Sequence, residues 1–155
     1  MISKIFVATD GSETALKASR YAVRLARQLG ASITILSVID NRSLASYCTV
    51  PCEVAPIHII EPAEKFLREA AKRDVAQVKK LCDKSGVSCR TVISSGHPAE
   101  EIIKVAERSR SHLIILGSHG RGALATVFLG SVTYGVIHKE TQIPVLIVRR
   151  GEKNK

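Results

Sequence analysis

Aromatic side chains and long hydrophobic runs are both scarce in this sequence. Tryptophan is absent and aromatic residues make up 4% of the chain, which leaves few platforms on which single-stranded nucleic acid could stack. Uninterrupted apolar runs such as Leu113–Leu116 and Val145–Val148 are far shorter than the ~20 residues of a membrane-spanning helix. The N-terminus lacks the pattern of a secretory signal. We therefore expect a cytoplasmic protein that has no membrane partner.

The spacing of a structural zinc site is also missing from the four cysteines. Cys48 and Cys52 form one CxxxC pair, whereas Cys82 and Cys89 are not grouped as a second short pair. Structural zinc sites usually combine two such pairs. We therefore expect no metal-binding residues and interpret the cysteines as buried or incidental thiols. A disulfide stays open, because intracellular proteins of hyperthermophiles contain disulfides.

Basic residues outnumber acidic ones, and the formal net charge is +9. Such an excess favours anionic partners such as nucleotides, nucleic acid or acidic surfaces. In Lys65–Lys84, however, the basic side chains are interleaved with Glu69, Asp74 and Asp83, which is typical of a solvated helix surface. Charge alone therefore does not identify a nucleic-acid-binding protein, and we do not expect a nucleic-acid partner.

The apolar residues alternate along the chain between short continuous runs and helical spacing. The runs predict strands, and the segments with helical spacing predict amphipathic helices that begin near proline or end near glycine. We predict strands at 4–9, 32–39, 87–95, 112–116 and 144–148, helices from 13 to the stop at Gly30, from Pro62 to near Gly86, from Pro98 and over 131–139, and a long loop over 40–60.

Strands that alternate with helices predict an α/β fold. The crossover connections make the sheet parallel and cover both of its faces with helices. A chain of 155 residues suits one domain, which we assign to residues 1–150, with residues 151–155 as a disordered basic tail. Ligands of such open sheets bind outside the carboxyl ends of the strands, where the strand order reverses. The loops after the first four strands are therefore the candidates for a site.

The segment from Gly117 to Thr133, which follows the fourth predicted strand, is rich in glycine. It leads into a helix that starts near Gly130-Ser131, and a helix start offers unpaired N–H groups and a positive dipole end. Glycine lets backbone N–H groups approach an anion without a Cβ in the way. The hydroxyl groups of Ser131 and Thr133 and the guanidinium of Arg121 add further donors. The segment therefore predicts a cradle for phosphates.

Two other phosphate motifs fit less well. The P-loop pattern GxxxxGK[ST] does not occur in the chain. Gly120–Ala125 matches the dinucleotide fingerprint GxGxxA, but it follows the fourth strand rather than the first. Arg149 and Arg150 stand where the acid that binds the ribose is expected. Because the match is incomplete, an NAD-binding oxidoreductase is only an alternative to the main prediction.

A third pattern, Gly-x2-Gly-x9-Gly-Ser, is met by Gly117, Gly120, Gly130 and Ser131. With this spacing the chain resembles the universal stress protein domain family, specifically its ATP-binding branch, from Lys4 to Arg149. The resemblance also covers three further features, which are Asp10-Gly11-Ser12 after the first strand, the Gly96-x-Pro98 turn and the closing run Pro144–Val148.

The resemblance implies a Rossmann-like sheet of five parallel strands in the order 3-2-1-4-5 and a homodimer paired through the last strand. It also implies bound ATP, or ADP or AMP, with Mg²⁺ or Mn²⁺ as an accompanying ion. Thr9 and Asp10 would lie beside the nucleoside, although Asp10 could instead cap the first helix together with Ser12. With the donors of the glycine segment added, the expected nucleotide-binding residues are Thr9, Asp10, Val38, Gly117, Ser118, Gly120, Arg121, Gly130, Ser131, Val132 and Thr133.

No set of residues in the sequence has the spacing of a catalytic site. The Gly-x-Ser-x-Gly motif of hydrolases is absent, and we assign no catalytic residue. The expected function is a nucleotide-binding switch in stress response with slow or no ATP hydrolysis. The alternatives are the NAD-binding oxidoreductase and a basic nucleic-acid-binding module.

Overall fold

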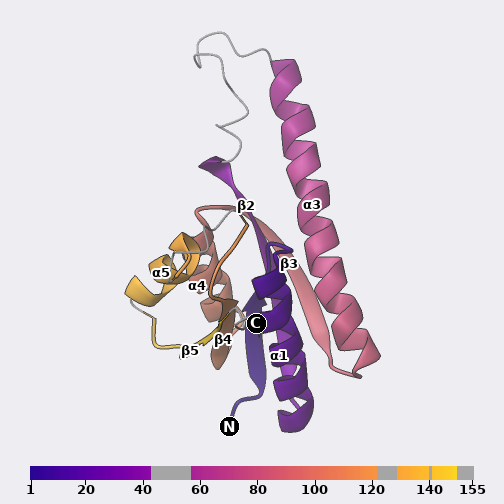
Figure 1. The fold of residues 1–155 in the computed structure, drawn as a ribbon, viewed down its shortest axis with the longest axis vertical. Helices are drawn as coiled ribbons and strands as arrows, with labels where there is room; N and C mark the ends of the chain where they lie inside the picture. The colour runs from indigo at the N-terminus through magenta and orange to yellow at the C-terminus, as the bar shows by residue number, and fades with distance from the viewer. Residues whose placement is uncertain (43–56, 122–128, 140, 150–155) are drawn as a thin grey trace, which may run out of the picture.

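The computed structural model describes residues 1–42, 57–121, 129–139 and 141–149. They form a five-stranded parallel sheet in the order β3-β2-β1-β4-β5, as predicted (Figure 1). In chain order the elements are β1 (Lys4–Ala8), α1 (Glu13–Leu29), β2 (Ser32–Asp40), α3 (Ile57–Lys84), β3 (Cys89–Gly96), α4 (Pro98–Arg108), β4 (Leu113–Gly117), α5 (Ser131–His138) and β5 (Val145–Val148).

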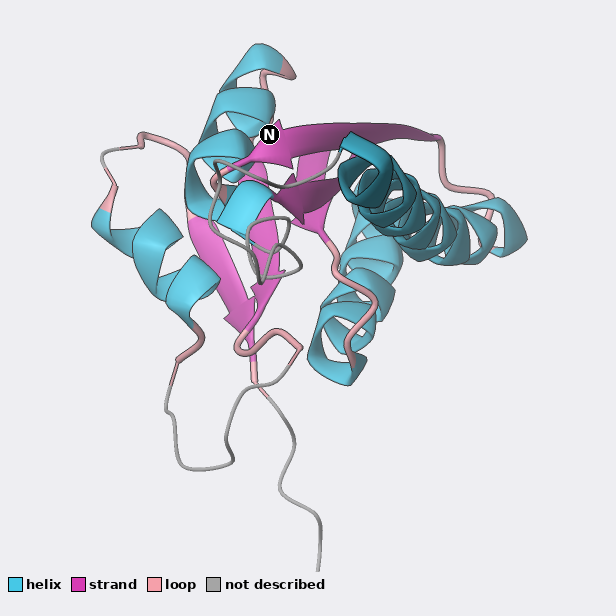
Figure 2. Ribbon diagram, turned by 90° about the horizontal axis from the view of Figure 1, so that it is seen from above, coloured by secondary structure: helices cyan, strands magenta, loops and turns pink. Residues whose placement is uncertain are grey.

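Helices cover both faces of the sheet, α1 and α3 on one side and α4 and α5 on the other (Figure 2). Neighbouring residues of a strand therefore enter different cores. In β1, Ile5 and Val7 pack under α1 and α3, whereas Phe6 packs under α4 and α5. All three side chains are completely buried. Burial on both faces explains why the strands read as continuous apolar runs rather than alternating ones.

Helix α1 begins where β1 ends, and its first turn is held by local hydrogen bonds. Ser12 is the N-cap residue, and its hydroxyl oxygen accepts a hydrogen bond from the backbone N–H of Ala15 at 3.3 Å. Gly30 ends the helix in the left-handed conformation, with φ 63°, which glycine adopts at little cost. The cap fixes the start of α1 beside the carboxyl ends of the strands.

The predicted start of α3 was wrong, because the helix begins at Ile57 rather than at Pro62. Proline is common in the first turn of a helix, where its missing N–H has no partner to lose. Here it lies further inside the helix and removes one backbone hydrogen bond. The predicted loop over 40–60 is thus helical at 57–60, while residues 43–56 lie outside the described residues, as does the predicted tail 151–155.

Within the part of the chain that the structure describes, no helix is both long and apolar enough to cross a membrane.

Candidate functional site

The candidate site lies where the strand order reverses, between β1 and β4. These two strands pair in parallel with Ile5 opposite Leu113 and Val7 opposite Ile115, so their carboxyl ends lie level. The loop after β1 carries Asp10, and the glycine segment follows β4 at Gly117. The structure therefore brings together the two loops that the sequence singled out.

The carboxylate of Asp10 connects these two loops. Its Oδ1 accepts a hydrogen bond from the N–H of Ser12 at 2.9 Å, and its Oδ2 accepts one from the N–H of Arg121 at 2.9 Å. The hydroxyl of Thr14 in α1 also donates to the carbonyl oxygen of His119. Asp10 thus helps to cap the start of α1, which was the alternative role considered for it, and it also holds the glycine segment against this helix.

Two of the predicted glycines are required by this close approach. A Cβ on Gly117 would lie 2.8 Å from the carbonyl carbon of Thr14 and 2.9 Å from the nitrogen of Ala15, both backbone atoms of α1. A Cβ on Gly120 would lie 2.8 Å from Oδ2 of Asp10. Such contacts are shorter than van der Waals packing allows, so the packing of the two loops needs glycine here even before a ligand is considered.

The far end of the glycine segment returns to β4. The N–H of Gly130 donates to the carbonyl oxygen of Ser118 at 2.7 Å, and the hydroxyl of Thr133 donates to the carbonyl oxygen of Gly117 at 2.8 Å. Gly130 is the N-cap residue of α5 and carries no side chain to occupy the helix start. Both ends of the segment are therefore held at the carboxyl end of β4, with the N-terminus of α5 beside them.

The first turn of α5 supplies N–H groups that the helix itself does not use. The first i→i−4 hydrogen bond runs from the N–H of Tyr134 to the carbonyl oxygen of Gly130 at 2.9 Å. The N–H groups of Ser131, Val132 and Thr133 precede it and have no acceptor within the helix. Together with the positive end of the helix dipole they make a site for an anion.

The predicted side-chain donors occupy different depths around this point. Ser118 and Thr133 are buried, with 2% and 4% of their surfaces exposed, and Thr9 is 4% exposed. Val132 packs against the core cluster under α4 and α5, whereas Ser131 is exposed. Ser131 is therefore the hydroxyl that a ligand at the helix start could reach most easily. Gly122, with the rest of the GxGxxA match up to residue 125, lies outside the described residues.

Val38 lies on the neighbouring strand, level with the loop after β1. Ala8 pairs with Leu36, and the N–H of Thr9 donates to the carbonyl oxygen of Leu36 at 2.8 Å. Two residues further along, this register places Val38 opposite Asp10. Asp40 then ends β2 and pairs with Arg42, whose Nη2 lies 2.7 Å from Oδ2 of the carboxylate. The hydrogen bond from Arg42 lowers the pKa of Asp40.

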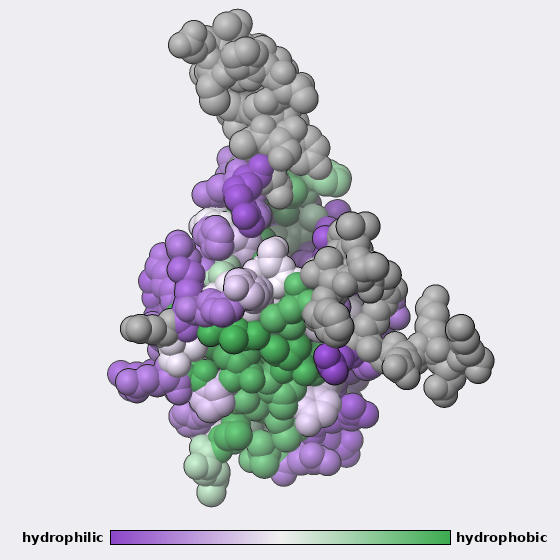
Figure 3. Space-filling model, turned by 60° about the vertical axis from the view of Figure 1, so that its left-hand side comes forward, coloured by the Kyte–Doolittle hydropathy of each residue, from purple (hydrophilic) through white to green (hydrophobic). Residues whose placement is uncertain are grey.

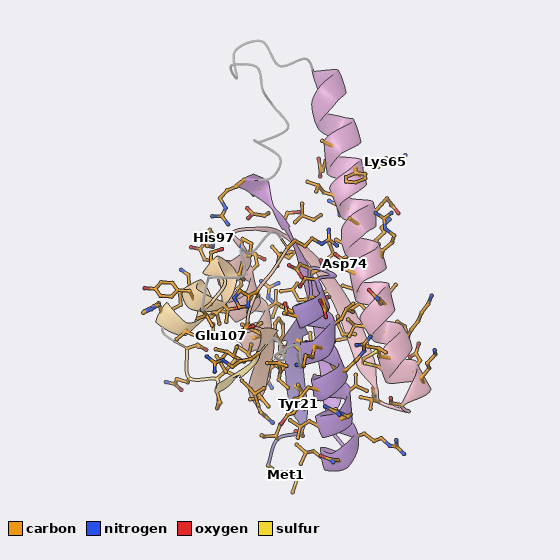
Figure 4. All side chains as sticks on the ribbon, in the orientation of Figure 1. Met1, Tyr21, Lys65, Asp74, His97 and Glu107 are labelled. Carbon is orange, nitrogen blue, oxygen red and sulfur yellow. The ribbon has the colours of Figure 1, made fainter. Side chains whose placement is uncertain are left out.

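Sequence reasoning missed Asp74 of α3. Nη2 of Arg121 lies 3.1 Å from Oδ1 and 3.2 Å from Oδ2 of Asp74, and only 13% of the Asp74 side chain is exposed. Burial raises the pKa of Asp74, the nearby Asp10 carboxylate adds to the rise, and the charge of Arg121 opposes it. Figure 4 shows Asp74 on the side of α3 that faces the rest of the molecule. Arg121, predicted to clamp phosphate, thus has an acidic partner in this structure.

The interpretation of the acidic residues of Lys65–Lys84 as solvated helix surface was therefore wrong for Asp74. A signal was present in the spacing, because Asp74 lies three residues after Ala71 and four before Val78, and both of these are buried. That spacing places the carboxylate on the face of the helix that packs on the sheet.

Two open hollows lie elsewhere on the described surface. One, of about 500 Å³, is lined by Ile103, Lys104 and Lys139 among others, and the other, of about 700 Å³, by Arg110, Thr141 and Ile143 among others. The second lies at the residues that precede β4 and β5, which is the end of the sheet opposite to Asp10. Neither hollow coincides with the predicted site.

The chain is similar over nearly its whole length to known proteins of one family. The model of the universal stress protein family matches residues 1–149. Universal stress protein MJ0531 of Methanocaldococcus jannaschii is 31% identical over 153 residues, which cover 99% of this chain and 85% of the relative. The solved structure of MJ0577 from the same organism superimposes with a TM-score of 0.83 at 35% identity and covers 99% of both chains.

Two other solved structures share the fold at lower identity. One is a universal stress protein in complex with cAMP, with a TM-score of 0.67 at 19% identity over 95% of this chain and 97% of that one. The other is a universal stress protein of Archaeoglobus fulgidus in complex with dAMP, with a TM-score of 0.64 at 20% identity over 96% of this chain and 99% of that one. From the family match and the identity to MJ0531 and MJ0577, we conclude that the chain belongs to the universal stress protein family.

Proposed function

We propose that this protein is an adenine-nucleotide-binding switch in stress response, which binds ATP, or ADP or AMP, with slow or no hydrolysis. One observation carries the proposal. The N–H of Gly130 bonds to the carbonyl oxygen of Ser118, and this bond holds the start of α5 at the point where the strand order reverses. An anion-binding helix start at such a point suits the phosphates of a nucleotide.

The phosphates would lie against the backbone of the glycine segment and α5. The N–H groups of Ser131 and Val132, the exposed hydroxyl of Ser131 and the absence of a side chain at Gly130 fit a group of high negative charge. Arg121 would turn its guanidinium from Asp74 toward the phosphates. Mg²⁺ or Mn²⁺ would accompany the phosphates, since free ATP carries such an ion.

The nucleoside would lie across the ends of β1 and β2. The Asp10 carboxylate suits hydroxyl groups of a ribose, and Val38 has backbone groups at the level of Asp10 that suit the edge of adenine. The structures of the same fold with cAMP and dAMP support this class of ligand. We assign no general base to this site.

Replacement of Gly130 tests the phosphate site with a matched pair of variants. Aspartate and asparagine are both good N-cap residues, so Gly130→Asp and Gly130→Asn should fold alike and add similar bulk near the Cα of His119. Only Gly130→Asp adds a negative charge. We expect calorimetric titration with ATP to show a loss of affinity of at least tenfold for Gly130→Asp relative to Gly130→Asn.

Unchanged ATP affinity in folded Gly130→Asp would overturn the proposal. The same titration with NAD separates the alternatives, because an oxidoreductase of the dinucleotide class would bind NAD more tightly than ATP. Binding of nucleic acid that falls steeply with salt and ignores added ATP would favour the basic nucleic-acid-binding module.

We also propose that two copies pair through β5. This strand is at one edge of the sheet, and its four residues Val145–Val148 are only partly buried. Figure 3 shows hydrophobic residues gathered on the face that carries α5 and β5, where Ile137 is 45% exposed. An apolar edge strand with unpaired backbone groups is a template for pairing with a second strand. Pairing with a second copy would bury both the edge of β5 and the hydrophobic residues beside it.

A further inference from the structure

The C-terminal end of α3 turns the chain sharply back toward the sheet. The N–H of Val87 donates to the carbonyl oxygen of Cys82 at 3.0 Å, and the N–H of Gly86 donates to that of Asp83 at 3.3 Å. Gly86 takes φ 65°. This pair of bonds is the Schellman arrangement that ends many helices. It directs β3, which starts at Cys89, under the last turns of α3.

The turn brings two cysteines into one apolar cluster. Cys82 is completely buried in the core under α1 and α3, and the partly buried Cys89 packs against that same core. Cys89 pairs in register with Ile33, which also belongs to this core. The two thiols therefore lie on the same face of the sheet, near enough for Cys89 to influence the Cys82 thiol. The pKa of the Cys82 thiol is raised to about 12, mainly because the thiol is buried and secondly because Cys89 lies beside it.

Lys79 adds a positive charge beside these thiols. It lies one turn before Cys82, and its ammonium group interacts electrostatically with both Cys82 and Cys89 while it pairs with Asp83 at 3.0 Å. Of the two cysteines, Cys89 is the one that solvent can reach. Oxidants therefore meet Cys89 first, with Cys82 held behind it.

The surroundings favour thiol chemistry over metal binding. Nowhere in the described residues do three or more His, Cys, Asp or Glu side chains gather as metal ligands. Cys89 is at the start of β3, the opposite end of that strand from the one that faces the candidate nucleotide site, so nucleotide binding does not use this pair.

We propose that Cys82 and Cys89 form a peroxide-sensitive dithiol that closes to an intramolecular disulfide. Cys89 sulfur attacks one oxygen of hydrogen peroxide, so that an S–O bond forms and the O–O bond breaks, and the leaving hydroxide takes the Cys89 thiol proton and departs as water. The sulfur of Cys82 then attacks Cys89 sulfur, so that the S–S bond forms and the S–O bond breaks, and the leaving hydroxide takes the Cys82 thiol proton and departs as a second water. Two thiols are oxidised, and one peroxide is reduced to two waters.

Peptide mapping tests this closure directly. The reduced protein is treated with hydrogen peroxide, remaining thiols are alkylated, and the chain is digested with trypsin without reductant. Trypsin cleaves after Lys84, so the two cysteines fall in separate peptides, 81–84 and 85–90. We expect these peptides to appear as one linked species that lacks two hydrogen atoms. The Cys48→Ser/Cys52→Ser double variant serves as the control and should give the same linked species.

Single variants test the order of events. In Cys89→Ser we expect Cys82 to stay reduced. In Cys82→Ala we expect Cys89 to form a sulfenic acid that dimedone traps, since its partner is gone. Circular dichroism shows whether each variant folds, and mapping of the wild-type chain decides the question if one does not. A disulfide between two chains, sulfinic acid at Cys89 without a cross-link, or fast oxidation of Cys82 in folded Cys89→Ser would each overturn the proposal.

Discussion

Gly117 shows how one residue can serve both the packing and the site. It ends β4 against the first turn of α1, where its Cα hydrogen faces the backbone of Thr14 and Ala15. Backbone atoms cannot rotate away as a side chain can, so any added carbon must push the strand end and the helix apart. The geometry of the proposed phosphate cradle therefore depends on the absence of a single methyl group.

Gly117→Ala should lower the free energy of unfolding by about 1–3 kcal/mol, the usual cost of overpacking. Urea denaturation measures it. Gly30→Ala is the control, because a Cβ there meets nothing within 4 Å. Its only cost is that alanine must adopt the left-handed backbone conformation, which destabilises the fold by roughly 1 kcal/mol. Equal stability of Gly117→Ala and the wild type would contradict this account.

Asp74 places a negative charge beside the proposed phosphate site. Asp74→Asn removes that charge and releases Arg121, so ATP affinity should rise by on the order of fivefold, or ~1 kcal/mol for a partly screened pair. Calorimetric titration measures the change. Asp83→Asn removes a charge from the same helix, at its exposed far end, and should leave the affinity unchanged. A fall in ATP affinity for Asp74→Asn would show that Asp74 positions Arg121 for binding.

The raised pKa of Asp74 also has a consequence for stability. The folded protein holds the proton on this carboxyl more tightly than the unfolded chain does, whose ordinary pKa is 3.8. The protonated Asp74 carboxyl therefore stabilises the folded state fully below pH 3.8, and this stabilisation is lost as the pH rises through the pKa of the folded state. Relative to Asp74→Asn, the wild type should gain stability as pH is lowered through this range, which denaturation at a series of pH values measures. A relative loss would contradict it.

At the scale of elements, α3 differs most from the other helices because it contains proline beyond its first turn. Pro62→Ala restores one backbone hydrogen bond, and an interior proline costs about 3 kcal/mol. Amide exchange in the first turns of α3 should therefore slow by on the order of tenfold or more. Pro98→Ala is the matched control, because Pro98 begins α4, where no bond is missing. Equal effects of the two substitutions would contradict the explanation.

The sequence predicted those elements whose signals are local. The apolar runs of β1, β2 and β4 and the glycine and proline at their ends depend on nearby residues, so their positions and the strand-end site could be inferred. The Asp74–Arg121 pair could not, because it depends on packing between residues far apart in the chain. The beginning of α3 was missed because proline is common in the first turn of a helix, whereas Pro62 lies further inside this one. Whether the predicted residues bind a nucleotide depends on a ligand, and remains a proposal.

At the scale of the whole molecule, the backbone of β5 suggests a test of the proposed dimer. The carbonyl oxygen of Pro144 accepts a hydrogen bond from Ile114 of β4, and that of Val148 accepts one from Ser118 just after β4. The alternating residues Val145 and Ile147 therefore turn their N–H groups to the open edge. Ile147→Pro removes one of these outer donors without breaking a bond to β4. Light scattering after gel filtration should show a dimer for the wild type and a monomer for this variant.

The other edge of the sheet provides the control. Just before β3, the carbonyl oxygen of Ser88 accepts a hydrogen bond from the N–H of Ile33 in β2, so Thr91, three residues further on, turns its N–H away from β2. Thr91→Pro makes the same chemical change at the opposite edge and should leave the dimer intact. A monomeric wild type, or loss of the dimer in both variants, would contradict pairing through β5.

The Asp74–Arg121 pair makes a long helix part of the proposed nucleotide site. By thermodynamic reciprocity, a nucleotide that draws Arg121 away from Asp74 alters the affinity of α3 for any partner that senses Asp74, and that partner alters nucleotide affinity by the same factor. At 1.5 Å per residue the 28 residues of α3 span about 40 Å. One ion pair thus connects the glycine segment to a helix that extends well beyond the sheet (Figure 1).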